Sequence, residues 1–162
     1  MKLSIELVPS TSWYNNLRKA LPKEEWDRIR KKCYANAGFR CEICGAKGML
    51  NCHEIWKYDD ANNIQKLEGF IALCELCHHI KHIGLSNILA SEGKLDMKRV
   101  IAHFMKVNGC DRGAFEAHEK EAFGEWEKRS AHDWKVVLGE YEGMISGKEN
   151  EKENKDSLKR FL

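Results

Sequence analysis

The sequence predicts an α+β fold, in which two strands and a helix lie between flanking amphipathic helices. Residues 49–56 and 70–73 have the pattern of strands and residues 75–83 that of a helix, which gives a β-β-α order. Stretches with helical spacing of apolar residues precede and follow this centre. We therefore expect four segments: an N-terminal strand and helices (1–40), a central module (41–84), a C-terminal helical region with a closing strand (85–142) and a disordered charged tail (143–162).

The N-terminal segment is expected to hold one strand and two helices. Residues 3–8 alternate apolar and polar positions, the period of a half-buried strand, and Pro9 ends this pattern. Apolar residues at helical spacing then predict a first helix after Ser10, and a second that Pro22 opens and that runs to about Ala37.

The C-terminal region is expected to hold two helices and a closing strand. Residues 97–107 and 114–128 have helical periodicity, and Asn108-Gly109 marks the stop between them. Residues 134–138 then form a predicted strand, which can pair with residues 3–8 in a small sheet of terminal strands. The chain beyond this point is charged and poor in apolar residues, so we expect most of it to be disordered.

Composition places the chain among ordered intracellular proteins. It is 43% hydrophobic with only two prolines, and its 27 Lys and Arg against 25 Asp and Glu give a net charge of +2. Any basic surface for nucleic acid must therefore be local. No apolar run approaches the roughly 18 residues that span a bilayer, and the apolar start is too short for a secretory signal. We therefore expect a cytoplasmic protein with no membrane partner.

Seven cysteines are a high count, and four of them form two C-x-x-C pairs separated by 29 residues. In a reducing compartment this spacing indicates metal binding before disulfides. Two such turns can supply four thiolates, at about 2.3 Å, to one tetrahedral ion, and this ligand set suits zinc far better than magnesium. The sequence therefore predicts a structural Zn²⁺ bound by Cys41, Cys44, Cys74 and Cys77.

Histidines near the second cysteine pair predict a second metal site. His78 and His82 are four residues apart, so a helix places both imidazoles on one face. His53 and Glu54 lie side by side on the strand between the two cysteine pairs, and closing the zinc site folds this strand back towards that helix. His79 lies one position round the helix and is expected outside the site.

These residues together resemble the HNH, or ββα-metal, nucleases, in the branch where two C-x-x-C pairs bracket the motif. His53-Glu54 takes the place of the family's Asp-His or His-His doublet, and His78 and His82 match its closing elements. The resemblance covers residues 41–84 of 162. It implies a ββα-metal module with a four-cysteine zinc knuckle, and an endonuclease that hydrolyses phosphodiester bonds in nucleic acid, with DNA favoured over RNA.

The family's chemistry assigns roles to these positions. The doublet's first member and the two helical residues hold one divalent ion, while the doublet's second member deprotonates the attacking water. The resemblance therefore implies His53, Glu54, His78 and His82 as catalytic residues, Zn²⁺ as scaffold, and Mg²⁺, Mn²⁺ or Ni²⁺ as the catalytic ion held by the three histidines. Arg40 and Lys81 are expected to contact phosphates.

Two departures from the family pattern leave details open. Either Glu54 is the general base with His53 as a ligand, or the register moves by one and His53 is the base beside Cys52; His53 is essential in both cases. Regular strand alternation puts residues 53 and 54 on opposite faces. Gly69 stands where the family's middle asparagine usually lies, so the loop-bracing hydrogen bond is expected from the asparagines at 62–63 or from the backbone.

Two other functions remain open from the sequence. A non-catalytic zinc-ribbon module would bind nucleic acid, and its histidines would be incidental. An adaptor tethered to a sliding clamp would use the C-terminal peptide, where Leu158, Phe161 and Leu162 resemble the short clamp-binding peptides of replication and repair enzymes. Lys155 stands where such peptides usually begin with glutamine.

Overall fold

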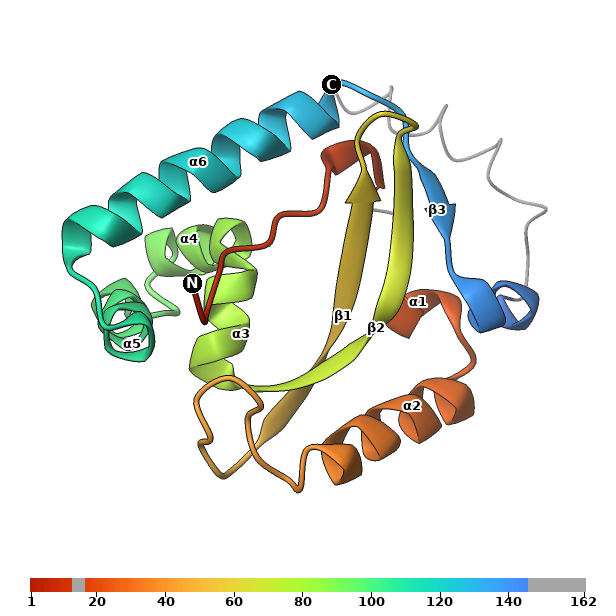
Figure 1. Cartoon of the computed structure of the whole chain (residues 1–162). Helices are drawn as coiled ribbons and strands as arrows, with labels where there is room; N and C mark the ends of the chain where they lie inside the picture. Colours follow the sequence, from red (N-terminus) through yellow and green to blue (C-terminus); the bar gives the residue numbers. More distant parts are fainter. Residues whose placement is uncertain (13–16, 146–162) are drawn as a thin grey trace.

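The fold is an α+β arrangement around a long β-hairpin that runs into a helix, as the β-β-α order predicts (Figure 1). The computed structural model describes residues 1–12 and 17–145. The centre consists of β1 (Leu50–Asp59), β2 (Ile64–Cys74) and α3 (Glu75–Lys81). The preceding elements are η1 (Ser10–Ser12), α1 (Leu17–Ala20) and α2 (Lys23–Asn36), and the following ones are α4 (Ile83–Ser91), α5 (Met97–Asn108), α6 (Arg112–Ser130), β3 (Lys135–Val137) and η2 (Gly139–Met144).

The hairpin is longer than the sequence predicts. Strands expected over 49–56 and 70–73 extend through the whole of β1 and β2, which pair antiparallel over their full length. The additional, distal half carries Lys57, Lys66 and Glu68 at exposed positions. The apolar residues alone therefore underestimate the length of the hairpin, because a strand with one solvated face needs few apolar residues.

A β-bulge lies in the middle of the hairpin. Ile55 pairs with Gly69 and Trp56 with Leu67, so Glu68 is an additional residue on β2. A bulge of this kind increases the local twist and bends the strand, and Figure 1 shows β2 curving across the molecule towards α3.

The third strand, β3, lies beside β2 and runs parallel to it, from the pair Ile64 and Lys135 onwards. The sheet order is β1-β2-β3, so the outer side of β1 has no partner strand among the described residues. The predicted closing strand at 134–138 is confirmed in its place. Its predicted partner is wrong, because β3 pairs with the hairpin and not with residues 3–8.

Residues 3–8 form an extended segment and not the predicted strand. The alternation in the sequence does correspond to burial, since Leu3 and Ile5 lie in the core. Their backbone N–H groups, however, donate to side chains: Leu3 to Asn108 Oδ1 at 3.0 Å and Ile5 to His118 Nε2 at 2.9 Å. The period of two therefore predicted correctly which residues are buried. It did not predict what this segment packs against, which is the helix pair α5 and α6.

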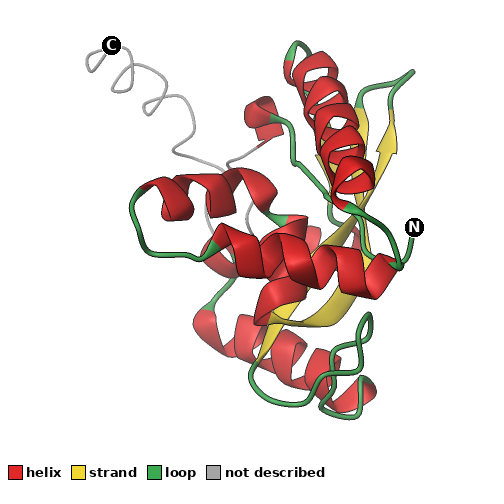
Figure 2. Ribbon diagram, turned by 90° about the vertical axis from the view of Figure 1, so that its left-hand side faces the viewer, coloured by secondary structure: helices red, strands yellow, loops and turns green. Residues whose placement is uncertain are grey.

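Two apolar cores lie on opposite faces of the hairpin. The first joins the N-terminal segment to the side of the hairpin covered by α3, α5 and α6, and in Figure 2 these helices lie in front of the strands. The second joins the other face to α1, α2 and the region of β3. The main members of the first are Leu3, Ile5, Leu73, Ile80, Ile83, Val100, Phe104 and Phe115, and those of the second are Leu17, Leu21, Ile29, Leu67 and Leu138.

Most helices agree with the prediction. Asp96 caps α5 by accepting from the N–H groups of Lys98 and Arg99, and Gly109 ends it with a left-handed φ of +63°. The helix α4 was not predicted, since α3 was expected to end the central module without a second helix behind it. None of the described helices has the length and apolarity needed to cross a bilayer.

The C-terminal tail was expected to begin at residue 143. The described part of the chain extends to Ile145, and Met144 and Ile145, within the first residues of the expected tail, pack against the second core. The predicted clamp-binding peptide with Leu158, Phe161 and Leu162 lies outside the described residues.

Candidate metal centres

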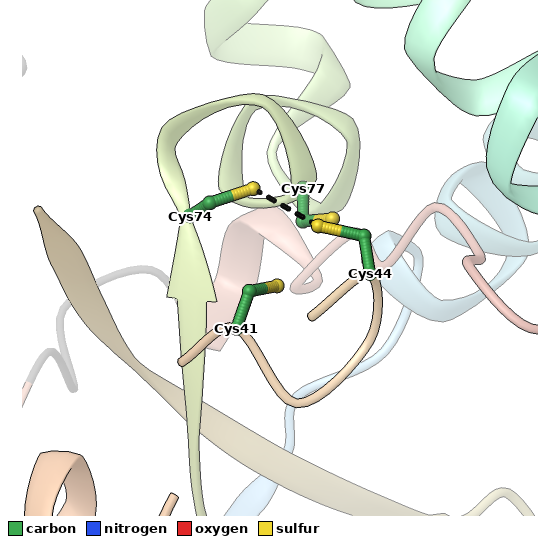
Figure 3. A group of neighbouring side chains, drawn as sticks. All are labelled: Cys41, Cys44, Cys74 and Cys77. Carbon is green, nitrogen blue, oxygen red and sulfur yellow. Dashed lines mark hydrogen bonds between the residues drawn. The ribbon is translucent and has the colours of Figure 1, made fainter. Parts of the chain in front are cut away.

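The first cysteine pair lies in a tight turn between α2 and β1. The Cys41 N–H donates to the Ala46 carbonyl at 2.9 Å, and the Gly45 N–H donates to the Cys41 carbonyl at 2.8 Å. Gly45 has a φ of +75°, a left-handed conformation that glycine adopts without a side-chain clash. The turn thereby carries Cys41 and Cys44 on one short loop (Figure 3).

The second pair lies where β2 runs into α3. Cys74 is the last residue of β2 and Cys77 lies in the first turn of α3. Glu42 ties the two pairs together, because its N–H donates to the Ala72 carbonyl at 3.0 Å and its carboxylate accepts from the Ala72 N–H at 2.7 Å. The bracing was expected from residues 62–63 or from the backbone; Glu42 supplies it through its backbone N–H and its carboxylate, whereas residues 62–63 lie at the far turn of the hairpin.

The four cysteine sulfurs form one cluster. All lie within 4.8 Å of one another, and the Sγ atoms of Cys44 and Cys74 are 3.5 Å apart. Figure 3 shows the four side chains pointing towards a common centre. Sulfurs bound at about 2.3 Å to a tetrahedral zinc lie about 3.8 Å apart. The cluster can therefore bind Zn²⁺ with little rearrangement.

The thiols of this cluster differ in how easily they ionise. Burial raises the pKa of Cys74 to about 11, and it raises the pKa of Cys77 beyond the usual thiol range. At Cys41 burial also acts to raise the pKa, but N–H groups of Cys44, Cys74 and Ile43 donate to the sulfur and lower it to about 7. Four thiolates together thus require a compensating cation, which zinc supplies.

His103 on α5 contacts the cluster, a role that its sequence position does not indicate. Its Nε2 lies 3.1 Å from the Cys77 Sγ, a distance at which a ring N–H can donate to a thiolate. Burial lowers the pKa of His103 and favours its neutral form. In the sequence this histidine reads as one more core position of a helix, and only the packing of α3 on α5 identifies it.

The three predicted histidines form a second cluster. His53 Nδ1 lies 3.1 Å from His82 Nε2, and the ring centroids of His78 and His82 are 4.6 Å apart. One ring nitrogen of each histidine lies within 4.8 Å of the other two. Nitrogens bound at about 2.1 Å to one tetrahedral ion lie about 3.4 Å apart. The group is therefore another possible metal site.

The helix geometry behind this cluster differs from the expectation. The helix α3 ends at Lys81, one residue before His82, which has a φ of −104° and a ψ of 47° and joins α3 to α4. The His82 N–H still donates to the His78 carbonyl at 3.1 Å. The four-residue spacing therefore brings the two rings together even though the helix is shorter than the predicted 75–83.

His78 and His82 are held in the neutral form that metal binding needs. Burial and the neighbouring imidazoles together lower the pKa of His78 to about 3. The same two causes lower the pKa of His82 to about 4. Both rings therefore offer lone pairs at neutral pH without losing a proton first.

The N-terminal segment adds a carboxylate beside this cluster that the sequence did not reveal. Glu6 Oε2 lies 3.2 Å from His53 Nε2, and Glu6 Oε1 accepts from the Lys81 ammonium, which also donates to Ser4 Oγ at 3.2 Å. Burial acts to raise the pKa of Glu6, but the hydrogen bond from His53 and the charge of Lys81 together lower it.

Lys81 and Arg40, the two predicted phosphate contacts, lie in different environments. Lys81 is only 7% exposed and its ammonium forms an ion pair with Glu6. It is therefore too buried to contact a phosphate, and its predicted role in binding nucleic acid does not fit the structure. Arg40 is exposed, with its guanidinium 3.5 Å from the Gly45 carbonyl, and its role in binding nucleic acid stays a prediction.

Glu54 lies next to the histidine cluster but on the other side of β1, as strand alternation requires. Burial raises the pKa of Glu54, and a hydrogen bond from the Leu17 N–H partly offsets this. Glu54, His53, His82 and Glu6 all line one cavity of about 40 Å³. Because residues from both faces of β1 reach it, the cavity lies at the edge of β1 that has no partner strand in the described part of the chain.

Comparison of the chain with protein-family models, curated proteins and solved structures finds no match. What the molecule can do is therefore inferred from its two clusters of metal-binding side chains.

Proposed function

We propose that the protein is a metal-dependent endonuclease that hydrolyses phosphodiester bonds in nucleic acid, with DNA as the favoured substrate. The observation that carries the proposal is the convergence of His53, His78 and His82, separate from the cysteine cluster, with His53 and His82 lining a cavity. Four thiolates complete the coordination of a structural zinc, whereas three imidazoles leave positions for water and substrate. A protein that only binds nucleic acid has no need of the second, open centre.

The donor set favours some of the expected ions over others. Neutral imidazoles suit Ni²⁺, while Mg²⁺ and Mn²⁺ prefer oxygen ligands. We therefore place Ni²⁺ before Mn²⁺ and Mg²⁺. When bound by the three histidines, such an ion would polarise a phosphoryl oxygen and stabilise the leaving oxygen.

Of the two candidates for the general base, Glu54 fits better than His53. Both nitrogens of His53 already have partners, since Nδ1 faces His82 at 3.1 Å and Nε2 faces Glu6 at 3.2 Å. Glu54 lines the same cavity, and burial raises its pKa, which makes the carboxylate a stronger proton acceptor. In this assignment His53 is a metal ligand and Glu54 takes the proton from the attacking water.

Exposed basic residues near the zinc knuckle support nucleic acid as the substrate. Arg40 and Lys47 lie on the first cysteine turn, and Lys31 and Lys32 lie in the last part of α2, which leads into it. Such a local group can contact phosphates although the net charge of the chain is only +2.

The test is nicking of supercoiled plasmid by zinc-loaded protein with added Mn²⁺, Ni²⁺ or Mg²⁺. We expect ion-dependent cleavage by the wild type and at least about a hundredfold loss in His53→Ala and His82→Ala, with one zinc per chain retained. His79→Ala is the matched control, because His79 lies on α3 beside His78 but outside the cluster, with its Nδ1 3.0 Å from Ser86 Oγ. Folded protein that cleaves neither duplex, single-stranded or branched DNA nor RNA would show that the alternative, a non-catalytic binding module, is correct.

A further inference from the structure

We propose that Glu6 is a positioning residue of the histidine centre, which holds the His53 ring so that Nδ1 faces the bound ion. The inference rests on the metal-binding part of the proposed function, the ion held by His53, His78 and His82. It assigns a role to the N-terminal segment, which no sequence motif connects to this centre.

The hydrogen bonds of His53 determine which nitrogen is free. A carboxylate only accepts, so Nε2, 3.2 Å from Glu6 Oε2, carries the ring proton. Nδ1 then holds the lone pair, and it points towards His82 Nε2 at 3.1 Å. His53 is 5% exposed, so water has little access to replace the carboxylate as the acceptor.

Glu6 is itself held at three points. Its N–H donates to the Lys81 carbonyl at 3.1 Å, one carboxylate oxygen accepts from the buried Lys81 ammonium, and the other lies against His53. Lys81 stands in the chain directly before His82, so Glu6 links the two elements that carry the metal ligands, β1 and α3. In Figure 1 the N-terminal segment, drawn in red, runs from beside α3 to the end of β1.

Glu6 acts through His53 and not as a ligand. Its oxygens do not belong to the group of potential ligand atoms that lie within 4.8 Å of one another. A carboxylate behind a ligating imidazole orients the ring and raises its basicity, and loss of such a partner weakens metal binding about 10- to 100-fold.

The experiment measures Ni²⁺ binding to the full-length, zinc-loaded protein by calorimetry, counting only the binding that His82→Ala abolishes. Glu6→Gln keeps an uncharged acceptor, so we expect about a tenfold loss of affinity, and up to about a hundredfold loss for Glu6→Ala. The double variant Glu6→Gln/Lys81→Met removes the ammonium that Glu6→Gln alone would leave unpaired, and it should show the same loss while folding normally. Glu75→Gln is the matched control, because Glu75 lies 3.9 Å from His79, outside the cluster.

A second readout follows the hydrogen bond directly. In ¹H NMR of the protein without Ni²⁺, the Nε2–H of His53 should give a slowly exchanging, downfield resonance that Glu6→Ala removes and Glu75→Gln retains. Glu6→Ala with Ni²⁺ affinity within twofold of the wild type would overturn the inference, as would wild type that binds no Ni²⁺ through His82. Glu6-dependent Ni²⁺ binding by a protein that cleaves no nucleic acid would support the inference and reject the nuclease.

Discussion

The ion pair between Glu6 and Lys81 predicts that its two partners contribute unequally to stability. The Lys81 side chain is 8% exposed, whereas that of Glu6 is 43% exposed. Lys81→Met leaves a carboxylate that water can still reach. Glu6→Gln leaves the buried Lys81 ammonium without its carboxylate partner. The Ser4 hydroxyl, at 3.2 Å, is then a neutral acceptor for it.

The sizes of these effects follow from the burial. Two unit charges about 4 Å apart attract by about 4 kcal/mol at an effective dielectric constant of 20, and both the exposure of Glu6 and the desolvation of Lys81 reduce the net value. We expect Glu6→Gln to lower the free energy of unfolding by about 2–3 kcal/mol and Lys81→Met by about 1 kcal/mol. The double variant should lose about 1.5 kcal/mol, a coupling of about 2 kcal/mol.

Urea unfolding of zinc-saturated protein, followed by far-ultraviolet circular dichroism, measures all four corners of this cycle at constant m-value. The pair of Lys94 and Glu92 is the control, because both side chains are exposed and their cycle should give less than about 0.5 kcal/mol. An unequal contribution of the two partners is refuted if Lys81→Met lowers the free energy of unfolding as much as Glu6→Gln, or if the coupling is no larger than in the control pair.

Three further predictions concern the two metal centres. Replacing His103 by Phe should weaken zinc binding about tenfold in competition with a chelator, because the donor to the Cys77 sulfur is lost, and unchanged affinity would contradict that contact. Glu54→Gln should slow plasmid nicking at least about a hundredfold with unchanged Ni²⁺ affinity, whereas a ligand or structural role would reduce both. Because the pKa values of His78 and His82 fall from 6.5 to about 3 and about 4 on folding, protons bind the unfolded chain first as the pH drops below about 6.5. The free energy of unfolding should then fall by up to about 1.4 kcal/mol per pH unit for each ring, and urea unfolding between pH 7 and 5.5 should show a shallower slope in His78→Gln.

The features that sequence reasoning found share one property: each depends on short spacings. The C-x-x-C turns, the four-residue spacing of His78 and His82 and the capping of α5 are determined within a few residues, so their patterns are visible without the fold. The cysteine pairs also imposed a long-range constraint, since joining them brings the intervening β1, and His53 with it, towards α3.

The features that the sequence did not reveal depend on contacts between residues far apart in the chain. Glu6 meets His53 across 47 positions of the chain, and His103 meets Cys77 across 26. Alternation over residues 3–8 signalled a buried face correctly, but side chains of α5 and α6 satisfied the backbone in place of a strand, and no local pattern distinguishes these outcomes. For the same reason the sequence indicates an exposed lysine at Lys81, and only the fold shows that its side chain is buried against Glu6.

The attachment of the N-terminal segment also determines when the histidine centre is completed during synthesis. The residues that hold this segment are made late: Asn108, His118 and Trp126 bind backbone groups of Leu3, Ile5 and Val8, across 105 to 118 positions. At about 5–20 residues per second, a growing chain takes roughly 5–24 s to add them. A nascent or prematurely terminated chain that contains all three histidines and both cysteine pairs therefore holds Glu6 only through His53 and Lys81, because the neighbouring Leu3, Ile5 and Val8 still lack their partners on α5 and α6. The N-terminal segment behind the second centre is fully attached only in chains translated through α6.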